Sequence, residues 1–256
     1  MPELPEAETI VRTLAPHLEG RRILELRFFS DCVRRGDPQG ANGQRILKVT
    51  RYGKMVVLML TEGMLLIRLG MTGRLLLNSV PGQHTRAMLY LDEGSLRFDD
   101  ARKFGSIEWV QQLPDYLGAD PLAITFKDFA ARLRLRRGAV KPLLLNQKFL
   151  RGIGNIYADE SLFRAGVHPR AKASSLNQAR VRRLFEAIRQ VLSEAIAAGG
   201  STISDYVDAM ERAGSFQYKH LVYRRTGAPC VHCGSPIRRI VVAQRGTHYC
   251  PRCQKL

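Results

Sequence analysis

Apolar residues recur with two different spacings along the chain. Residues 6–18 carry apolar side chains at helical spacing, with acidic residues near the start and Gly20 after the end, which predicts an N-terminal helix. From Arg45 to Leu113 the pattern changes to short runs typical of β-strands, at 55–60, 64–69, 74–77, 88–91, 96–98 and 107–110. These runs predict a β-sandwich or barrel, with a hairpin turn at residues 92–95.

The second half of the chain has a different pattern. After residues 118–121, which are typical of a linker, helical periodicity predicts helices at 126–135, 140–146, 155–165 and 175–198. We also expect a short helix from Ser201 that leads into a mobile loop at residues 211–215. The second domain is therefore predicted to be helical.

Composition limits the class of protein. The chain has 256 residues, of which 45% are hydrophobic, enough for two modest cores and a small appendage. No apolar run approaches the ~18 residues of a membrane span, and no basic segment followed by an apolar stretch opens the chain. We expect neither a membrane span nor a signal peptide, and an intracellular, cytoplasmic protein.

The net charge of +17 is concentrated in one half. Residues 1–125 hold 16 Lys and Arg against 15 Asp and Glu, whereas residues 126–256 hold 24 against 8. A surface this basic attracts polyanions and gains affinity through counterion release. The charge favours nucleic acid as the partner, and a solvated basic face remains the alternative.

Four of the five cysteines lie in the last 27 residues. They form two C-x-x-C pairs, Cys230 with Cys233 and Cys250 with Cys253, whose spacing is typical of one tetrahedral zinc site. Between the pairs, runs at 237–243 and 246–249 predict a β-hairpin whose arginines, Arg245 among them, are placed to contact phosphates or a groove.

Two glycines precede the predicted helix at residue 155. Gly152 and Gly154 allow backbone N–H groups to approach an anion, and Asn155 is a natural N-cap at a helix end that favours negative charge. This outline fits a phosphate site, but a simple tight turn before a helix explains it as well.

The N-terminus offers a candidate nucleophile. Removal of Met1 exposes the secondary amine of Pro2, and α-amino groups titrate near ~7.7–8.0, so an appreciable fraction is unprotonated at neutral pH. Attack on a sugar C1′ gives an iminium ion that stays cationic, and Glu3 could transfer protons. The alternative is that Glu3 and Glu6 only favour the start of the first helix.

Taken together, these motifs resemble the formamidopyrimidine-DNA glycosylase family, bacterial 8-oxoguanine DNA glycosylases with AP lyase activity. The resemblance covers nearly the whole chain, in PELPE at 2–6, RYGK at 51–54, LGMTG at 69–73, DDARKFG at 99–105, GIGNIYADESLF at 152–163 and AQRGTHYCPRCQK at 243–255.

The resemblance implies an α+β multidomain protein that grips damaged double-stranded DNA as a monomer. Its expected domains are an N-terminal helix and catalytic β-sandwich at 1–117, a helix-two-turn-helix DNA-binding domain at 122–224 and a C-terminal four-cysteine zinc finger β-hairpin at 225–256. One structural Zn²⁺ is implied. The implied activity is excision of oxidised purines through a Schiff base, followed by β,δ-elimination.

The resemblance also implies roles for single residues. It gives Pro2 as nucleophile, Glu3 as proton donor, Lys54 in β-elimination and phosphate contact, and Arg245 in δ-elimination. Met71, Arg102 and Phe104 would enter the duplex and fill the void left by the extruded base, which offsets part of the lost stacking. Further DNA contacts are implied for Arg68, Arg86, Arg136 and Asn155.

Some positions depart from the family pattern. Arg68 and Arg86 stand where the family often has His, which keeps a cation but removes a titratable group. Arg224 stands where the family has Gly. Two alternatives stay open: an endonuclease VIII-like glycosylase that prefers oxidised pyrimidines, and a non-catalytic zinc-dependent DNA-binding protein. The ELPE start, the GIGNIYADE block and the 209–219 segment favour the purine branch.

Overall fold

The computed structural model describes residues 2–256, which divide into two compact units. The first comprises the described residues up to Asp115 together with Ile196–Gln217, and the second comprises Tyr116–Ala195 and Tyr218–Leu256. The domain limits expected above stay predictions. Among the described residues, no helix is both long and apolar enough to cross a membrane.

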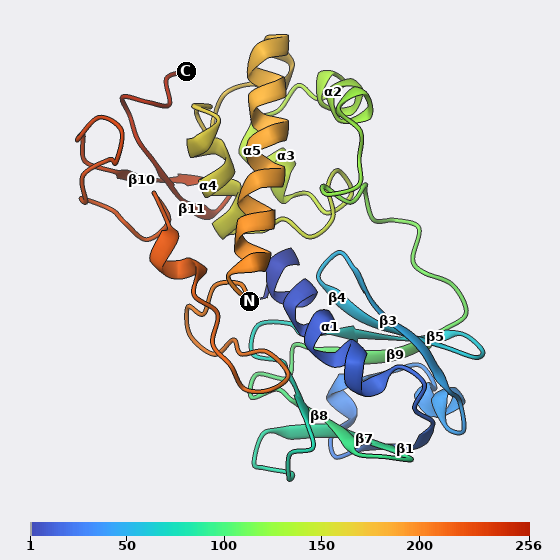
Figure 1. Cartoon of the computed structure of the whole chain (residues 1–256). Helices are drawn as coiled ribbons and strands as arrows, with labels where there is room; N and C mark the ends of the chain where they lie inside the picture. The colour runs from blue at the N-terminus through green and yellow to red at the C-terminus, as the bar shows by residue number, and fades with distance from the viewer. Residues whose placement is uncertain (1) are drawn as a thin grey trace. The chain divides into compact units, whose positions relative to one another are not determined.

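The first unit begins with α1, Leu4–Leu18, which packs against β3 and β4 (Figure 1). Its apolar stripe, including Leu14 and Leu18, is fully buried, so the predicted helix is confirmed. The helix starts two residues earlier than expected because Pro5 is tolerated in a first turn. Glu3 caps it, and the Glu3 and Glu6 side chains each accept the other residue's backbone N–H, forming a capping box.

Two sheets form the rest of the first unit. The five-stranded sheet has the order β2-β9-β5-β4-β3, with strands Arg34–Arg35, Ser106–Val110, Met64–Arg68, Met55–Leu60 and Ile46–Tyr52. The four-stranded sheet has the order β1-β7-β8-β6, with strands Ile23–Phe28, Thr85–Leu91, Ser95–Asp99 and Arg74–Leu77. Short 3-10 turns lie between β1 and β3, at Asp31–Val33 and Pro38–Ala41.

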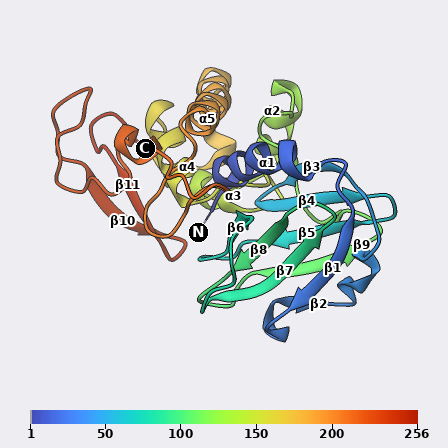
Figure 2. The same cartoon turned by 60° about the horizontal axis from the view of Figure 1, so that its bottom comes forward.

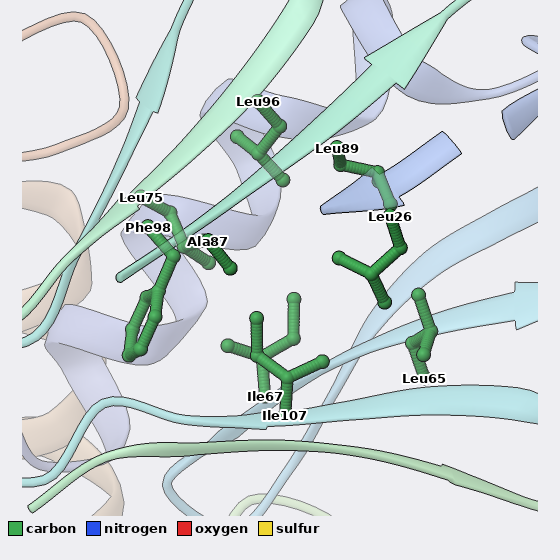
Figure 3. A pocket seen from close by; sticks show the side chains of 9 residues that line it. All are labelled: Leu26, Leu65, Ile67, Leu75, Ala87, Leu89, Leu96, Phe98 and Ile107. Atoms are coloured by element: carbon green, nitrogen blue, oxygen red, sulfur yellow. The ribbon is translucent and has the colours of Figure 1, made fainter. Parts of the chain in front are cut away.

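The two sheets pack face to face, so the sandwich is confirmed and the barrel alternative is wrong. In Figure 3, Leu65, Ile67 and Ile107 of one sheet point toward Leu26 and Leu89 of the other across a small apolar void. Strands β1, β2 and β3 were not among the predicted runs. In β1, a register shift between Ile23 and Glu25 interrupts the alternation of apolar and polar residues at the start of the strand. The predicted hairpin turn at residues 92–95 is present between β7 and β8.

The second unit contains four α-helices, with bounds close to those expected: α2 Phe126–Arg134, α3 Val140–Leu145, α4 Asn155–Arg164 and α5 Gln178–Ala197. Phe126 and Phe129 of α2 pack on Phe185 of α5, with ring centroids 5.6 and 5.5 Å apart. Arg164 of α4 pairs with Glu194 of α5 at 2.6 Å. The helix α5 is therefore the common packing partner of α2 and α4 (Figure 1).

The short helix expected from Ser201 is not formed, so that prediction is wrong. Gly199 and Gly200 have φ angles of +73° and +81°, which end α5 and turn the chain away from helical geometry. The backbone then pairs with a later segment, since Ser215 N–H donates to Ala198 O at 2.9 Å and Phe216 N–H donates to Gly200 O at 3.0 Å. Phe216 begins a single 3-10 turn, Phe216–Lys219.

The C-terminal hairpin is confirmed. Strands β10, Arg238–Val242, and β11, Arg245–Tyr249, pair antiparallel (Figure 2). The two turn residues between them, Ala243 and Gln244, have φ angles of +47° and +60°. Positive φ at both central positions is the type I′ geometry that matches the twist of a two-residue hairpin.

A buried histidine in the second unit makes stability depend on pH. Burial, and then the charge of Arg224, lowers the pKa of His220 to about 4. An unfolded histidine titrates near ~6.5, so the unfolded state binds more protons between these values. The free energy of unfolding should fall by about 3 kcal/mol as the pH drops from about 6.5 to about 4.

Urea unfolding of the zinc-loaded protein across this pH range measures the effect. His220→Gln should flatten the dependence, whereas His17→Gln, at an exposed position of α1, should leave it unchanged. Equal slopes for His220→Gln and the parent protein contradict this assignment.

Candidate active site and nucleic-acid interface

The N-terminal segment is buried and held by Glu6. Pro2 and Glu3 are both buried directly before α1. Glu3 N–H donates to Oε2 of Glu6 at 2.7 Å, while Oε1 of Glu6 accepts the N–H of Ser201 at 2.8 Å. From the sequence, Glu6 was expected only to favour the start of the helix. The three-residue spacing of Glu3 and Glu6 could have indicated the capping box. The structure makes this carboxylate the link between the candidate nucleophile and the 199–202 segment.

The 199–202 segment lies so close to Glu6 that a side chain at Gly200 would not fit. A Cβ atom at Gly200 would lie 2.8 Å from Oε1 of Glu6. Tyr206, buried nearby, donates its hydroxyl to Gly199 O at 3.0 Å. Burial raises the pKa of Tyr206, so this hydroxyl stays protonated as a donor.

Lys54 lies in the tight turn between β3 and β4, after Gly53, whose φ is +66°. Arg51, just before the turn, donates from Nε to Oε2 of Glu8 at 3.1 Å and from Nη1 to Gly53 O at 3.1 Å. The turn that carries Lys54 is therefore bound to α1, the helix that begins two residues after the candidate nucleophile Pro2.

Five predicted DNA-binding residues gather around two loops at one end of the sandwich, residues 69–73 and 100–105. The residues Met71 and Phe104 are 40% and 60% exposed, and the Arg102 guanidinium lies over the Phe104 ring, 4.8 Å from its centroid. Exposed apolar side chains beside cations suit insertion into a base stack. Arg68 pairs with Glu108 at 2.9 Å, and Arg86 donates from Nε to Asp100 O at 2.8 Å.

In the second unit, Asn155 takes a different place from the one expected. The N-cap of α4 is Gly154, in extended geometry, and Asn155 is the first helical residue, so the expectation that Asn155 caps the helix is wrong. Its side chain instead donates from Nδ2 to Gly246 O at 2.9 Å. Arg136 is exposed in the connection between α2 and α3.

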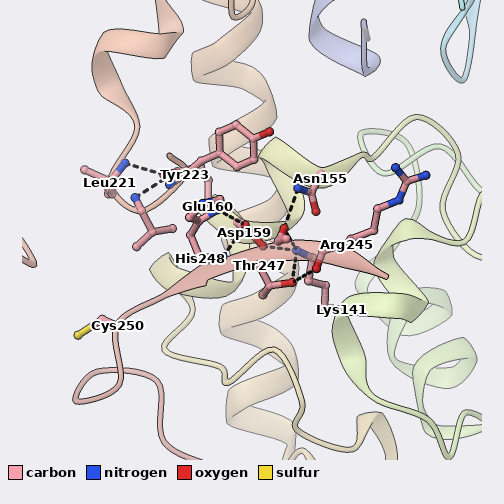
Figure 4. A network of polar contacts seen from close by, with 12 residues as sticks. Lys141, Asn155, Asp159, Glu160, Leu221, Tyr223, Arg245, Thr247, His248 and Cys250 are labelled. Carbon is pink, nitrogen blue, oxygen red and sulfur yellow. Dashed lines mark hydrogen bonds and ion pairs between the residues drawn. The ribbon is translucent and has the colours of Figure 1, made fainter. Parts of the chain in front are cut away.

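A buried ion pair fixes the finger hairpin to the helices (Figure 4). Lys141 of α3 and Asp159 of α4 are both fully buried, with Nζ 2.6 Å from Oδ1. Nζ also lies 2.7 Å from Oγ1 of Thr247, and the other Asp159 oxygen accepts the N–H of His248 at 2.8 Å. Since Arg245 is two residues before Thr247, this pair holds the strand that carries the candidate elimination residue.

Sequence reasoning missed Lys141, Asp159 and Glu160. No local sequence pattern distinguishes a buried lysine in a helix from an exposed one. Asp159 and Glu160 fall inside the GIGNIYADESLF block, but they were not singled out. Their partners lie far along the chain, so the pairings were not readable from spacing.

Glu160 holds the segment that leads into the finger. Its buried carboxylate accepts the backbone N–H groups of Leu221, Val222 and Tyr223 at 2.8–3.0 Å (Figure 4). Burial raises the pKa of Glu160, while the three N–H donors act in the opposite direction. The next residue, Arg224, has a φ of +59°, which explains why glycine is favoured at this position in the family pattern.

The four cysteines of the finger fit one metal ion. Their Sγ atoms all lie within 4.8 Å of one another, with Cys230 and Cys253 3.8 Å apart and Cys233 and Cys250 3.5 Å apart. A tetrahedral zinc with Zn–S bonds of ~2.3 Å requires sulfur atoms about 3.8 Å apart. The donor set and its dimensions are those of a structural zinc site.

Comparison with known families accounts for nearly the whole chain. Residues 1–107 match the formamidopyrimidine-DNA glycosylase N-terminal domain, residues 117–207 match the H2TH domain of the same glycosylase, and residues 227–256 match the zinc finger found in FPG and IleRS. The chain belongs to the formamidopyrimidine-DNA glycosylase family. The finger of this glycosylase family member accordingly holds one structural zinc ion.

Individual members of the formamidopyrimidine-DNA glycosylase family are similar over their full length. The formamidopyrimidine-DNA glycosylase of Solibacter usitatus is 54% identical, with 100% of both chains covered, and that of Thermus thermophilus is 44% identical, with 99% of this chain and 98% of the relative covered.

Solved structures of glycosylases from this family have the same fold. The MutM (Fpg) protein from Thermus thermophilus superposes with a TM-score of 0.90 at 43% identity, over 99% of this chain and 98% of that one. A Lactococcus lactis FPG point mutant, in complex with a Fapy-dG containing DNA, superposes with a TM-score of 0.92 at 32% identity and covers 100% of both chains.

Proposed function

We propose that this protein is a bifunctional DNA glycosylase and AP lyase of base excision repair, which removes oxidised purines such as 8-oxoguanine and formamidopyrimidines. The observation that carries the proposal is the buried Pro2-Glu3 pair at the start of α1, in a chain that belongs to this glycosylase family throughout. A relative from Lactococcus lactis was solved with DNA that contains Fapy-dG, which supports the same class of substrate.

In the proposed reaction, the Pro2 nitrogen attacks C1′ of the damaged nucleotide once Met1 has been removed. The N–C1′ bond forms as the glycosidic bond breaks, and the departing base takes a proton for which Glu3 is the candidate donor. The Pro2 nitrogen then loses its proton, and its lone pair opens the C1′–O4′ bond while O4′ takes a proton, which gives an iminium ion. This iminium has no N–H proton to lose, so it stays cationic and withdraws electrons during the eliminations that cut the strand. Lys54 and Arg245 are the candidates that assist β- and δ-elimination.

The DNA-binding part of the proposal assigns a role to each remaining residue of the interface. Met71 and Phe104 fill the void left by the extruded base, Arg102 contacts the orphaned base, and Arg68, Arg86, Arg136 and Asn155 contact phosphates. We propose that the protein acts as a monomer on damaged double-stranded DNA in the bacterial cytoplasm.

A panel of lesion duplexes tests this function against its alternatives. The zinc-loaded, Met1-processed protein is incubated in single turnover with duplexes that contain 8-oxoguanine, a formamidopyrimidine, an oxidised pyrimidine or no lesion. We expect base release and strand cleavage to be fastest on the two purine lesions. Faster cleavage of the oxidised pyrimidine supports the endonuclease VIII-like alternative, and binding without cleavage of any duplex supports the non-catalytic one.

Removal of zinc should abolish strand cleavage mainly through loss of DNA binding. The finger hairpin carries Arg245 and depends on the four cysteines for its fold, because small zinc sites couple metal binding to folding. A chelated sample, verified as zinc-free, should neither bind nor cut lesion duplex, and added zinc should restore both. Normal binding and cutting by the zinc-free protein contradicts this role.

A further inference from the structure

Asp100 is a fully buried carboxylate directly after β8, outside the residues discussed so far as candidates for chemistry. Its Oδ1 accepts the hydroxyl of Thr72 at 2.5 Å and the N–H of Arg102 at 3.2 Å, and its Oδ2 accepts the N–H of Gly105 at 2.7 Å. Both carboxylate oxygens are thus occupied by donors from two different loops. These hydrogen bonds stabilise the local structure, because a buried carboxylate without its donors would be left uncompensated.

The two loops that meet at Asp100 are residues 69–73, before β6, and residues 100–105, before β9. They touch along their backbones, because a Cβ atom at Gly70 would lie 2.7 Å from the carbonyl carbon of Phe104 and 2.8 Å from Gly105 N. The Thr72 hydroxyl also lies 3.2 Å from the N–H of Arg102. Backbone contact and side-chain hydrogen bonds therefore join residues 69–73 and 100–105 into one body.

This body presents the three side chains that we expect to enter the duplex. Met71 projects from the first loop, and Arg102 and Phe104 project from the second, where Lys103 between them has a φ of +58°. This left-handed conformation is costly for a residue with a Cβ atom, and it accompanies the packing of the Arg102 guanidinium over the Phe104 ring. The surrounding hydrogen bonds to Asp100 hold the conformation.

We infer that Asp100 is a positioning residue that locks the two loops together and so presents Met71, Arg102 and Phe104 to DNA in a fixed arrangement. The inference rests on the proposed function, because it needs these three side chains to occupy the void in the duplex. Its physical basis is pre-organisation: a loop that is competent only one tenth of the time binds about tenfold more weakly than a locked loop.

The test compares two substrates, so that positioning is separated from folding and from chemistry. The first is a duplex with 8-oxoguanine opposite cytosine, measured as kcat/KM for excision. The second is a single-stranded oligonucleotide with an abasic site, measured as the rate of borohydride-trapped adduct, because it has no opposite strand and no void to fill. All variants are zinc-loaded, and their thermal unfolding is recorded.

Two variants of Asp100 separate hydrogen bonding from size. Asp100→Leu removes every acceptor and should lower kcat/KM on the duplex about tenfold while trapping on the single strand persists. Asp100→Asn keeps one acceptor oxygen and can donate to the Thr72 hydroxyl, so it should stay within about threefold of the parent on the duplex.

Two further variants serve as matched controls. Asp99→Leu makes the same change one residue earlier, where the carboxylate bonds to Thr85 at 2.8 Å and pairs with Arg97 at 3.2 Å rather than with the two loops. It should cost stability without a selective loss on the duplex. Thr72→Val removes only the hydroxyl that links the two loops, and it should lower duplex excision about threefold. If Asp100→Leu does not fold, Thr72→Val alone tests whether the link between the loops matters for excision.

The effect should also depend on the side chains that Asp100 positions. In a Phe104→Ala background, Asp100→Leu should lower duplex excision by less than it does in the parent protein, because residues that act as a unit are not additive. Three results overturn the inference. The first is an equal loss of activity on the duplex and on the single strand, and the second is a fully additive loss of duplex excision when Asp100→Leu is combined with Phe104→Ala. The third is unchanged duplex excision in both Asp100→Leu and Thr72→Val. If the parent protein itself excises no 8-oxoguanine from the duplex, the proposed function fails and this inference fails with it.

Discussion

Glu3→Gln should abolish most base excision while DNA binding and the fold are retained. The substitution keeps the size of the side chain and an oxygen that can accept the Glu6 N–H of the capping box, but it removes the transferable proton. Loss of a general acid lowers a rate by about 10²–10⁴-fold. Single-turnover release of 8-oxoguanine from duplex DNA measures the effect.

An abasic duplex is the internal comparison for Glu3→Gln, because this substrate has no base to protonate and should lose much less activity. Glu25→Gln, at a partly exposed position of β1, is the control variant and should leave both activities unchanged. If Glu3→Gln excises 8-oxoguanine at the parent rate, Glu3 is not the proton donor.

Lys141→Met should destabilise the second unit by about 3–5 kcal/mol, because removal of one partner leaves the Asp159 charge buried without compensation. It should also weaken DNA binding, since the same lysine holds Thr247 and the Gly246 carbonyl beside Arg245. Urea unfolding and titration with an abasic-site duplex measure the two effects in zinc-loaded protein.

A double variant tests the cause of this loss. In Lys141→Met with Asp159→Asn, residue 159 is neutral and can still accept the N–H of His248, so most of the stability should return. Lys148→Met, at an exposed position nearby, should change stability by less than about 0.5 kcal/mol. If the double variant is as unstable as the single one, an unpaired buried charge is not the reason.

Periodicity was sufficient to predict most of the elements, and it failed where local geometry departs from the ideal. The strand β1 was not among the predicted runs, and a register shift between Ile23 and Glu25 interrupts the alternation at its start. The helix expected from Ser201 was wrong because two glycines with positive φ angles redirect the chain. The expected cap at Asn155 was wrong because Gly154 supplies the extended residue before α4.

The candidate site shows a similar limit. Motifs in sequence order indicated Pro2, Glu3 and the four cysteines, because their chemistry depends on residue type and local spacing. Asp100, Lys141 and Glu160 were not found, because their partners come from other loops and helices. The Lys141–Thr247 contact spans 106 positions of the chain, a separation at which sequence spacing carries no information.

Long-range contacts also decide which segments of the chain pack together. Residues 196–217, which comprise the end of α5 and the segment after it, belong by their contacts to the compact unit of α1. The links are specific: Glu6 accepts the Ser201 N–H, and Leu77 N–H donates to Ala209 O at 3.0 Å. Such pairings are long-range and depend on the folded sandwich.

Mass spectrometry of the borohydride-trapped complex tests directly whether the N-terminal proline attacks the damaged nucleotide. The processed, zinc-loaded protein is reacted with an 8-oxoguanine duplex in the presence of borohydride, digested and mapped by peptide. We predict a covalent sugar adduct on the Pro2 nitrogen. An adduct on Lys54 or another residue, or no adduct from protein that binds the duplex, contradicts attack by Pro2.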